Sequence, residues 1–239
     1  MDILYEDNHL ILVNKPFGMA SQGDQTGDES VVDWVKSYLK RTYDKPGNVY
    51  LGLIHRLDRP AGGILVLGKT SKAASRLSQQ FQAKEVEKVY LALTERRPPA
   101  AQGELIHHLT KLPGRNIMRA HRKPVADSKQ AKLRYEVLHT HGSRALVQVQ
   151  LETGRRHQIR VQLASLGCTI KGDVKYGPTS FNPDQSICLL ARRLTFVHPT
   201  LKKSLTVELP VPEGPIWRPF NRLDRLATKI KQPRVIWGK

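Results

Sequence analysis

The chain has 239 residues, of which 39% are hydrophobic, enough for a sizeable core in one large domain or two small ones. No apolar run approaches the roughly 18 residues that span a bilayer, and the N-terminus lacks the order of a signal peptide. We therefore expect a cytoplasmic protein without a membrane partner. The 39 basic and 21 acidic residues give a net charge of +18, which predicts an extended anionic partner, and nucleic acid fits best.

Apolar periodicity predicts an α+β fold, a mixed, largely antiparallel β-sheet flanked by helices in a single domain. Residues 3–16 predict a β-hairpin or two short strands. Further strands are expected at residues 64–67, 85–93, 133–138, 145–151, 187–190, 194–197 and 205–209. Amphipathic spacing predicts helices at residues 31–41, from a cap at Ser71 to about Lys84, and between Gly154 and Gly167.

Two stretches have little periodicity. Residues 96–129 are rich in Pro, Gly, His, Lys and Arg and predict an irregular basic excursion between two halves of the sheet. From residue 214 onward seven Lys or Arg face one Asp, which predicts a poorly ordered or surface-packed basic tail. The expected division is therefore a main domain of residues 1–212 and a C-terminal tail of residues 213–239.

Neither the cysteines nor the histidines form a recognisable metal site. Cys168 and Cys188 lie in no metal or redox motif, and we expect both to be free thiols. His107, His108 and His121 lack the spacing and companion ligands of a metal centre. The sequence therefore predicts no bound metal.

The first candidate site is a loop that leads into a buried strand. It places Asp58 between Arg56 and Arg59, whose charges favour the ionised carboxylate even when it is partly buried. Gly62-Gly63 after it let the backbone turn or approach another group closely. A structural ion pair is the alternative interpretation for a single aspartate in such a loop.

The second candidate site is the start of the third expected helix. Thr153-Gly154 turn the chain, and cations crowd the first helical turns, where they oppose the helix dipole. This placement of cations costs stability unless a carboxylate or a phosphate binds beside them. We therefore expect an anion-binding site at this helix start rather than a face that is only solvated. The cations and the histidine concerned are Arg155, Arg156, His157 and Arg160.

Three motifs in a fixed order resemble those of the RluA-type pseudouridine synthases, which isomerise specific uridines in RNA. His55-Arg56-Leu57-Asp58 is similar to the catalytic-aspartate motif of that family, Lys88-Val89-Tyr90 to its tyrosine motif, and residues 153–160 (TGRRHQIR) to its basic motif. The resemblance covers about residues 3–212. It implies the pseudouridine synthase fold, an isomerase that uses no metal and no cofactor, and rRNA or tRNA as the partner. We expect the enzyme to be monomeric.

The resemblance also implies roles for three catalytic residues. Asp58 would be the nucleophile that attacks either the sugar or the uracil ring. Tyr90 would stack on the target uracil and help to remove its C5 proton. Arg160 would pair with Asp58 and hold it ionised.

The remaining implied roles concern RNA binding. Arg56 would occupy the gap left by the flipped uridine, and Leu189 would form a wall of the pocket. Arg155, Arg156 and the wider basic surface would bind phosphates. The full set of expected RNA-binding residues is His55, Arg56, Arg59, Arg155, Arg156, His157 and Leu189.

The chain departs from the family pattern at four places without losing a catalytic group, so the departures bear on packing and substrate choice. Ala61-Gly62 replaces the common Thr-Ser, Gln162 a common His, Thr169 a common Pro, and Leu190 a common His.

Two other functions compete with the isomerase. A non-catalytic RNA-binding or ribosome-assembly protein with the same fold would tolerate Asp58→Asn. A glycosidase-like hydrolase would need a second carboxyl group, for which Glu152 is a weak candidate.

Overall fold

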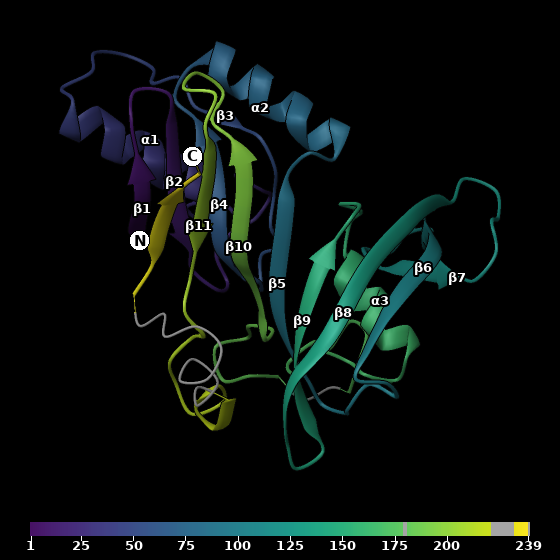
Figure 1. The fold of residues 1–239 in the computed structure, drawn as a ribbon. Coiled ribbons are helices and arrows are strands. Elements are labelled where there is room, and N and C mark those ends of the chain that lie inside the picture. Colours follow the sequence, from purple (N-terminus) through teal and green to yellow (C-terminus); the bar gives the residue numbers. More distant parts are fainter. Residues whose placement is uncertain (179–180, 221–231, 239) are drawn as a thin grey trace. The chain divides into compact units, whose positions relative to one another are not determined.

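The computed structural model describes residues 1–178, 181–220 and 232–238. These residues form two compact units, which Figure 1 shows as ribbons. Unit 1 contains the described residues of Met1–Val86, Arg193–Leu209 and Gln232–Lys239, and unit 2 those of Glu87–Arg192 and Pro210–Lys231. Within the described residues, no helix is long and apolar enough to cross a bilayer.

Unit 1 combines antiparallel strand pairs with two helices. Its elements are β1 (Asp2–Glu6), β2 (Leu10–Lys15), α1 (Val31–Thr42), β3 (Gly52–Leu53), β4 (Gly62–Gly68), α2 (Ser71–Ala83), β11 (Ser204–Glu208) and β12 (Arg234–Trp237). Strand β2 pairs with β1 and β4, β4 also pairs with β3, and β11 pairs with β12. The core is centred on β2 and β4, because both are continuous apolar runs that can be buried on two faces.

Local capping explains where the helices of unit 1 begin. Ser30 is the N-cap of α1, and it forms a reciprocal capping box with Asp33. Helix α2 is capped by Thr70 and not by the expected Ser71, because Thr70 has an extended backbone and its hydroxyl accepts a hydrogen bond from the Ala73 N–H (3.2 Å).

Unit 2 is an antiparallel ribbon of strands with one helix against it. Its elements are β5 (Glu87–Thr94), β6 (Gln102–Lys111), β7 (Met118–His121), β8 (Lys129–His141), β9 (Arg144–Leu151) and α3 (Gln158–Ser165). The strand order is β5-β9-β8-β6-β7, so β7 lies at an edge. Helix α3 contacts β6 and β7, beside which it lies in Figure 1.

The α+β class with a mixed, largely antiparallel sheet architecture is confirmed, but several details of the sequence prediction were wrong. The supposedly irregular residues 96–129 contain β6 and β7, whose polar faces obscure their strand pattern. The two strands expected at residues 187–190 and 194–197 are one strand, β10 (Leu189–Val197), which continues through the arginines 192–193. This strand has residues in both units.

The C-terminal residues contribute a strand that the sequence did not predict. Residues 234–237 form β12, which pairs with β11, so this part of the expected tail packs on the sheet of unit 1. Residues 221–231 of the expected tail lie outside the described residues. Cys168 and Cys188 are both buried free thiols, as expected.

Candidate active site

Asp58 lies half-buried in the loop between β3 and β4, and the backbone on both sides of it is fixed by hydrogen bonds. The N–H of the buried Leu57 donates to the Ser21 hydroxyl (3.0 Å), which in turn donates to the Leu57 carbonyl (2.9 Å). On the other side the Ala61 N–H donates to the Asp58 carbonyl (3.0 Å). The backbone that carries this carboxylate is therefore held in one geometry within unit 1.

A buried lysine also holds this loop. Lys15 is 1% exposed, and its Nζ donates to the carbonyls of Pro16 (2.9 Å), Met19 (2.6 Å) and Arg59 (3.1 Å). Burial lowers the pKa of Lys15 to about 7, and the charge of Asp58 opposes this shift. Three carbonyls match the three donors of an ammonium group. The sequence signal for Lys15, which we missed, is a lysine at the end of a strand that begins with four apolar residues, directly before a proline.

The side chain of Arg59 is engaged within the chain. Its Nη1 lies 2.7 Å from Asp28, and its Nη2 lies 2.9 Å from Asp24 and donates to the Thr26 hydroxyl (2.7 Å). An RNA phosphate that bound Arg59 would therefore compete with two carboxylates. Arg56, by contrast, is exposed on the surface.

His55 fastens the loop to the strand that follows it. The Nε2 atom of His55 accepts a hydrogen bond from the Val66 N–H (3.2 Å), so Nε2 carries no proton in this arrangement. The His55 ring also stacks on Phe81, with 4.8 Å between ring centroids. Both glycines after the loop behave as expected, since a Cβ on Gly62 would lie 3.0 Å from the Phe17 ring and Gly63 has a φ of 112°.

The basic motif is arranged differently from the expectation. Helix α3 begins only at Gln158, because His157 before it adopts a left-handed backbone (φ 51°). Arg155 and Arg156 are thus exposed residues of the preceding turn, and only Arg160 lies in the first helical turn. The buried Gln158 holds that turn, since its Oε1 accepts from the Thr153 hydroxyl (2.8 Å) and from the Arg155 N–H (2.9 Å).

Arg160 is 3% exposed and forms a bidentate ion pair with the equally buried Asp173. The Nε and Nη2 atoms of Arg160 each lie 2.7 Å from an Asp173 carboxylate oxygen. This carboxylate compensates the cation in the first turn of α3, so an internal group meets the requirement that we derived from the helix dipole. Asp173 lies in the glycine-containing loop of residues 167–176, and no motif in the sequence marks it as a partner of Arg160.

Tyr176 connects the basic motif to strand β7. Its hydroxyl accepts a hydrogen bond from the Met118 N–H (2.7 Å) and lies 2.8 Å from Nδ1 of the buried His157. The guanidinium carbon of Arg160 lies 5.3 Å from the centre of the Tyr176 ring. This tyrosine therefore orders three elements of unit 2.

The other predicted site residues occupy regular strands. Tyr90 lies in β5 opposite Val149 and is half-buried, whereas Val89 and Leu91 beside it are buried. Leu189 is the buried first residue of β10. Asp58 belongs to unit 1, and Tyr90, Arg160 and Leu189 belong to unit 2.

The remaining side chains considered as candidates have structural roles in unit 2. Glu152 forms ion pairs with Lys132 (3.2 Å) and Arg134 (3.3 Å), unlike the general acid of a glycosidase, which needs an environment that favours its neutral form. Gln162, where the family commonly has His, is fully buried and donates to the Leu105 carbonyl (3.0 Å). Among the described residues, no group of three His, Cys, Asp or Glu side chains is arranged to hold a metal ion.

Comparison with known proteins identifies the family. Residues 9–165 match the family model of RNA pseudouridylate synthase. An RNA pseudouridine synthase of Bacillus subtilis, YhcT, is 32% identical over 89% of this chain and 69% of its own. The ribosomal large subunit pseudouridine synthase C of Vibrio cholerae is 30% identical over 96% of this chain and 69% of its own.

A solved structure agrees with these sequence relatives. The human RNA pseudouridylate synthase domain containing 4 superimposes with a TM-score of 0.74 at 25% identity, covering 97% of this chain and 94% of the human one. A match over most of the chain, in sequence and in fold, identifies an isomerase that acts on RNA. The chain belongs to the RNA pseudouridylate synthase family.

Proposed function

We propose that this enzyme isomerises specific uridines of large-subunit ribosomal RNA, with Asp58 as the nucleophile. The proposal of ribosomal RNA rests on the relatives named ribosomal large subunit pseudouridine synthase C and D. The net charge of +18 suits a large, highly phosphorylated partner of this kind. Transfer RNA is the other substrate class that the sequence leaves open.

The observation that carries the catalytic assignment is the fixed backbone around Asp58. Buried donors and acceptors from Lys15 and Ser21 hold the residues on either side of it, which positions the carboxylate before substrate binds. A fixed nucleophile reduces the entropy that the reaction must lose on reaching its transition state. A surface loop with only a structural role does not need such buried polar groups, which are costly to desolvate.

The reaction exchanges one bond between the sugar and the base. The Asp58 carboxylate bonds to the sugar or the uracil ring, and the glycosidic bond from N1 to C1′ breaks. The ring turns, a bond from C5 to C1′ forms, and the temporary bond to Asp58 breaks, which restores the free carboxylate. C5 then loses its proton and N1 gains one, so the product is an isomer of the substrate. In this proposal Tyr90 stacks on the uracil and helps to remove the C5 proton, and the ion-paired Arg160 keeps Asp58 ionised.

The RNA-binding roles follow from the same proposal. Arg56 enters the gap that the flipped uridine leaves, and Leu189 forms part of the pocket wall. The exposed Arg155 and Arg156 bind phosphates. The other expected RNA-binding residues, His55, Arg59 and His157, are bonded within the chain and shape the surface on which the RNA lies. We further propose that residues 1–212 form the catalytic domain, followed by a basic C-terminal segment, and that the enzyme acts as a monomer in the cytoplasm, where ribosomal RNA is available.

The test measures tritium release from RNA that is labelled at uridine C5. Large-subunit ribosomal and transfer RNA transcripts are incubated with the wild type and with Asp58→Asn, a nearly isosteric variant without the nucleophilic carboxylate. We expect release from ribosomal RNA by the wild type alone. Equal release by both proteins would refute Asp58 as the nucleophile, and release from transfer RNA alone would refute the ribosomal substrate.

A further inference from the structure

The edge of unit 2 carries a concentration of positive charge that the catalytic motifs do not include. Residues 105–130, which contain β7 and its flanking loops, hold a single acidic residue, Asp127. The cations of the same stretch are Lys111, Arg115, Arg119, Arg122, Lys123 and Lys129. All six are exposed.

These cations differ from others on the same ribbon in how they are compensated. Lys132 and Arg134 on β8 form ion pairs with Glu104 and with Glu152. Within the described part of the chain, none of the six edge cations forms an ion pair. Carboxylates on β6 and just after β9 therefore compensate the cations of β8, whereas the cations around β7 are left uncompensated. This costs electrostatic free energy in the absence of an anionic partner.

The fold presents part of this charge on one face. On β7, Met118 and Ala120 pack against the cluster of Leu109, Ala131 and Val161, beside α3. Because side chains alternate along a strand, the exposed Arg119 between them lies on the opposite face.

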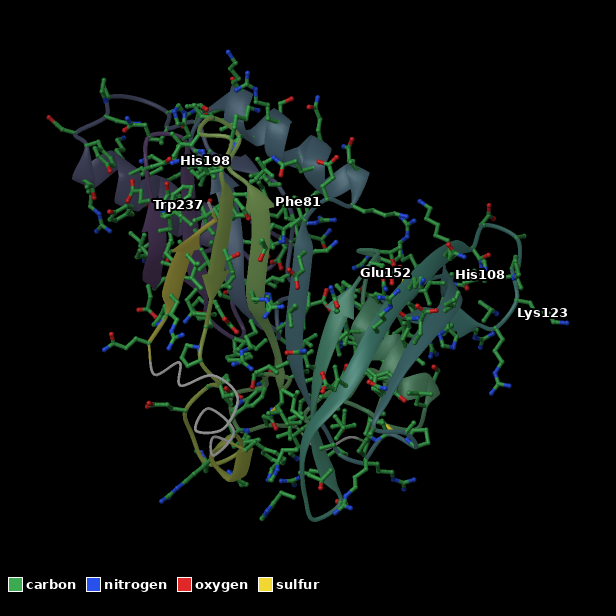
Figure 2. The ribbon with its side chains drawn as sticks, viewed as in Figure 1. Phe81, His108, Lys123, Glu152, His198 and Trp237 are labelled. Atoms are coloured by element: carbon green, nitrogen blue, oxygen red, sulfur yellow. The ribbon has the colours of Figure 1, made fainter. Side chains whose placement is uncertain are left out.

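Further cations flank β7 along the chain. Arg115 lies in the loop before β7, and Arg122 and Lys123 follow it directly. Figure 2 shows Lys123 projecting from the loop that follows β7.

This edge is joined to the basic motif within unit 2. Tyr176 bonds both to the Met118 N–H on β7 and to His157 in the motif. Arg155 of the motif reaches β8, where its Nε donates to the Gln130 carbonyl (3.0 Å). An RNA strand bound at Arg155 thus lies next to the ribbon that carries the edge cations.

We propose that Arg115, Arg119, Arg122 and Lys123, here called the edge cluster, bind phosphates of the RNA that flanks the target uridine. The proposal rests on the proposed function, because it extends the phosphate contacts of the basic motif to a longer stretch of RNA. Exposed guanidinium and ammonium groups on a ribbon contact phosphates without reading bases, since A-form RNA hides its major-groove edges. The edge cluster therefore adds affinity for long structured RNA without selecting its sequence.

The test compares a variant with all four residues of the edge cluster replaced by Ala and a control with the same loss of charge. The control replaces four exposed cations of unit 1, Lys40, Arg41, Lys45 and Lys72. Binding to a 60-nucleotide RNA hairpin and to a 12-nucleotide single strand is measured at several salt concentrations. Each lost phosphate contact lowers the slope of log K against log salt by about 0.7–0.9.

We expect the edge-cluster variant to bind the hairpin at least tenfold more weakly, with a salt slope smaller by about 3, and to bind the short strand as the wild type does. Wild-type affinity and slope on the hairpin would overturn the proposal, as would an equal loss in the control. The single variants Arg119→Ala and Lys123→Ala, each expected to lower the slope by about 1, give the same answer if the fourfold variant does not fold.

This measurement does not depend on catalysis. If the wild type forms no pseudouridine in any RNA but the edge-cluster variant alone loses hairpin binding, the proposed function fails and the edge cluster is supported. If the wild type is active and hairpin binding is unchanged in the variant, the edge cluster is refuted and the proposed function stands.

Discussion

The residues next to Asp58 show how buried polar groups can fix a nucleophile that is itself partly exposed. Ser21 is 5% exposed and satisfies both backbone groups of Leu57, and Lys15 satisfies the carbonyl of Arg59. A buried polar group without a partner costs about 1–3 kcal/mol, so each of these side chains stabilises one loop geometry over others. The loop is determined by side chains that are distant in sequence.

Ser21→Ala tests this role directly. The variant leaves the N–H and the carbonyl of Leu57 without their partner, so we expect a loss of about 1–3 kcal/mol in the free energy of unfolding. Movement of Asp58 should lower kcat with little change in KM, because a misplacement of about 1 Å can cost about 100-fold in rate. Urea denaturation and steady-state kinetics measure both effects.

Ser37→Ala is the matched control for that variant, since Ser37 is exposed on α1. We expect it to change neither stability nor rate by a measurable amount. An unchanged kcat in Ser21→Ala, at the stability of the wild type, would show that the hydroxyl does not position Asp58.

The ion pair of Arg160 with Asp173 allows stability and catalysis to be separated. Asp173→Asn leaves a buried guanidinium without its carboxylate, which should cost about 3–5 kcal/mol in the free energy of unfolding. The double variant Arg160→Met, Asp173→Leu replaces the pair with apolar side chains and should recover much of that stability. If Arg160 keeps Asp58 ionised, this double variant should be inactive although it is stable. Wild-type activity in the double variant would refute that role of Arg160.

At the scale of elements, Tyr176 explains how a short edge strand is held in a defined position. Strand β7 has four residues, and besides its pairing with β6 the Met118 N–H is bonded to the Tyr176 hydroxyl. Tyr176→Phe removes this acceptor and the partner of His157 while keeping the ring. We expect a larger loss of affinity for long RNA than for a short single strand that contacts the basic motif alone, and a loss of about 1–3 kcal/mol in the free energy of unfolding.

Fluorescence anisotropy with both RNA lengths measures that difference. Tyr38→Phe is a control on α1, where the hydroxyl contacts Glu6 in unit 1. Equal weakening for the long and the short RNA in Tyr176→Phe would contradict a role of Tyr176 in positioning the edge of unit 2.

The elements that the sequence predicts well are those whose pattern is set by burial. The apolar run of β4 predicts a strand that is buried on two faces, and the apolar stripe of α1 predicts a helix that is buried on one face. In both elements burial dictates the residue types. Strands β6 and β7 could not be recognised in this way, since histidines and cations occupy their faces. The start of α3 was misplaced because the left-handed backbone of His157 has no signature in its residue type.

The candidate site was predictable where it depends on motifs and unpredictable where it depends on distant contacts. Asp58, Tyr90 and Arg160 stand out through their neighbours in the sequence. Lys15 and Ser21 bond to the neighbours of Asp58 across 44 and 36 positions, and Asp173 lies 13 positions from Arg160. Only the pairing of strands and loops brings these partners into contact. Polar residues of this kind look like ordinary surface positions until their burial is known.

At the scale of the whole molecule, the chain passes between the two units more than once, and one strand is divided between them. Unit 1 is assembled from three separate segments, and β10 contributes residues to both units. Unfolding of either unit alone would disrupt this strand. We therefore expect one cooperative transition, which the thiols of Cys168 and Cys188 can report because both lie in unit 2.

Thiol labelling at pH 8 in increasing urea tests that cooperativity. Burial raises the pKa of Cys188 to about 12 and also raises that of Cys168, so little of the reactive thiolate exists in the native state and neither thiol should be labelled without urea. The fluorescence of Trp34, in unit 1, is followed in a variant that has Phe in place of the other two tryptophans. Labelling should begin only at the urea concentration at which this fluorescence changes. Labelling at urea concentrations that leave the Trp34 signal native would show that unit 2 opens alone, because cooperative loss of β10 requires both signals to change together.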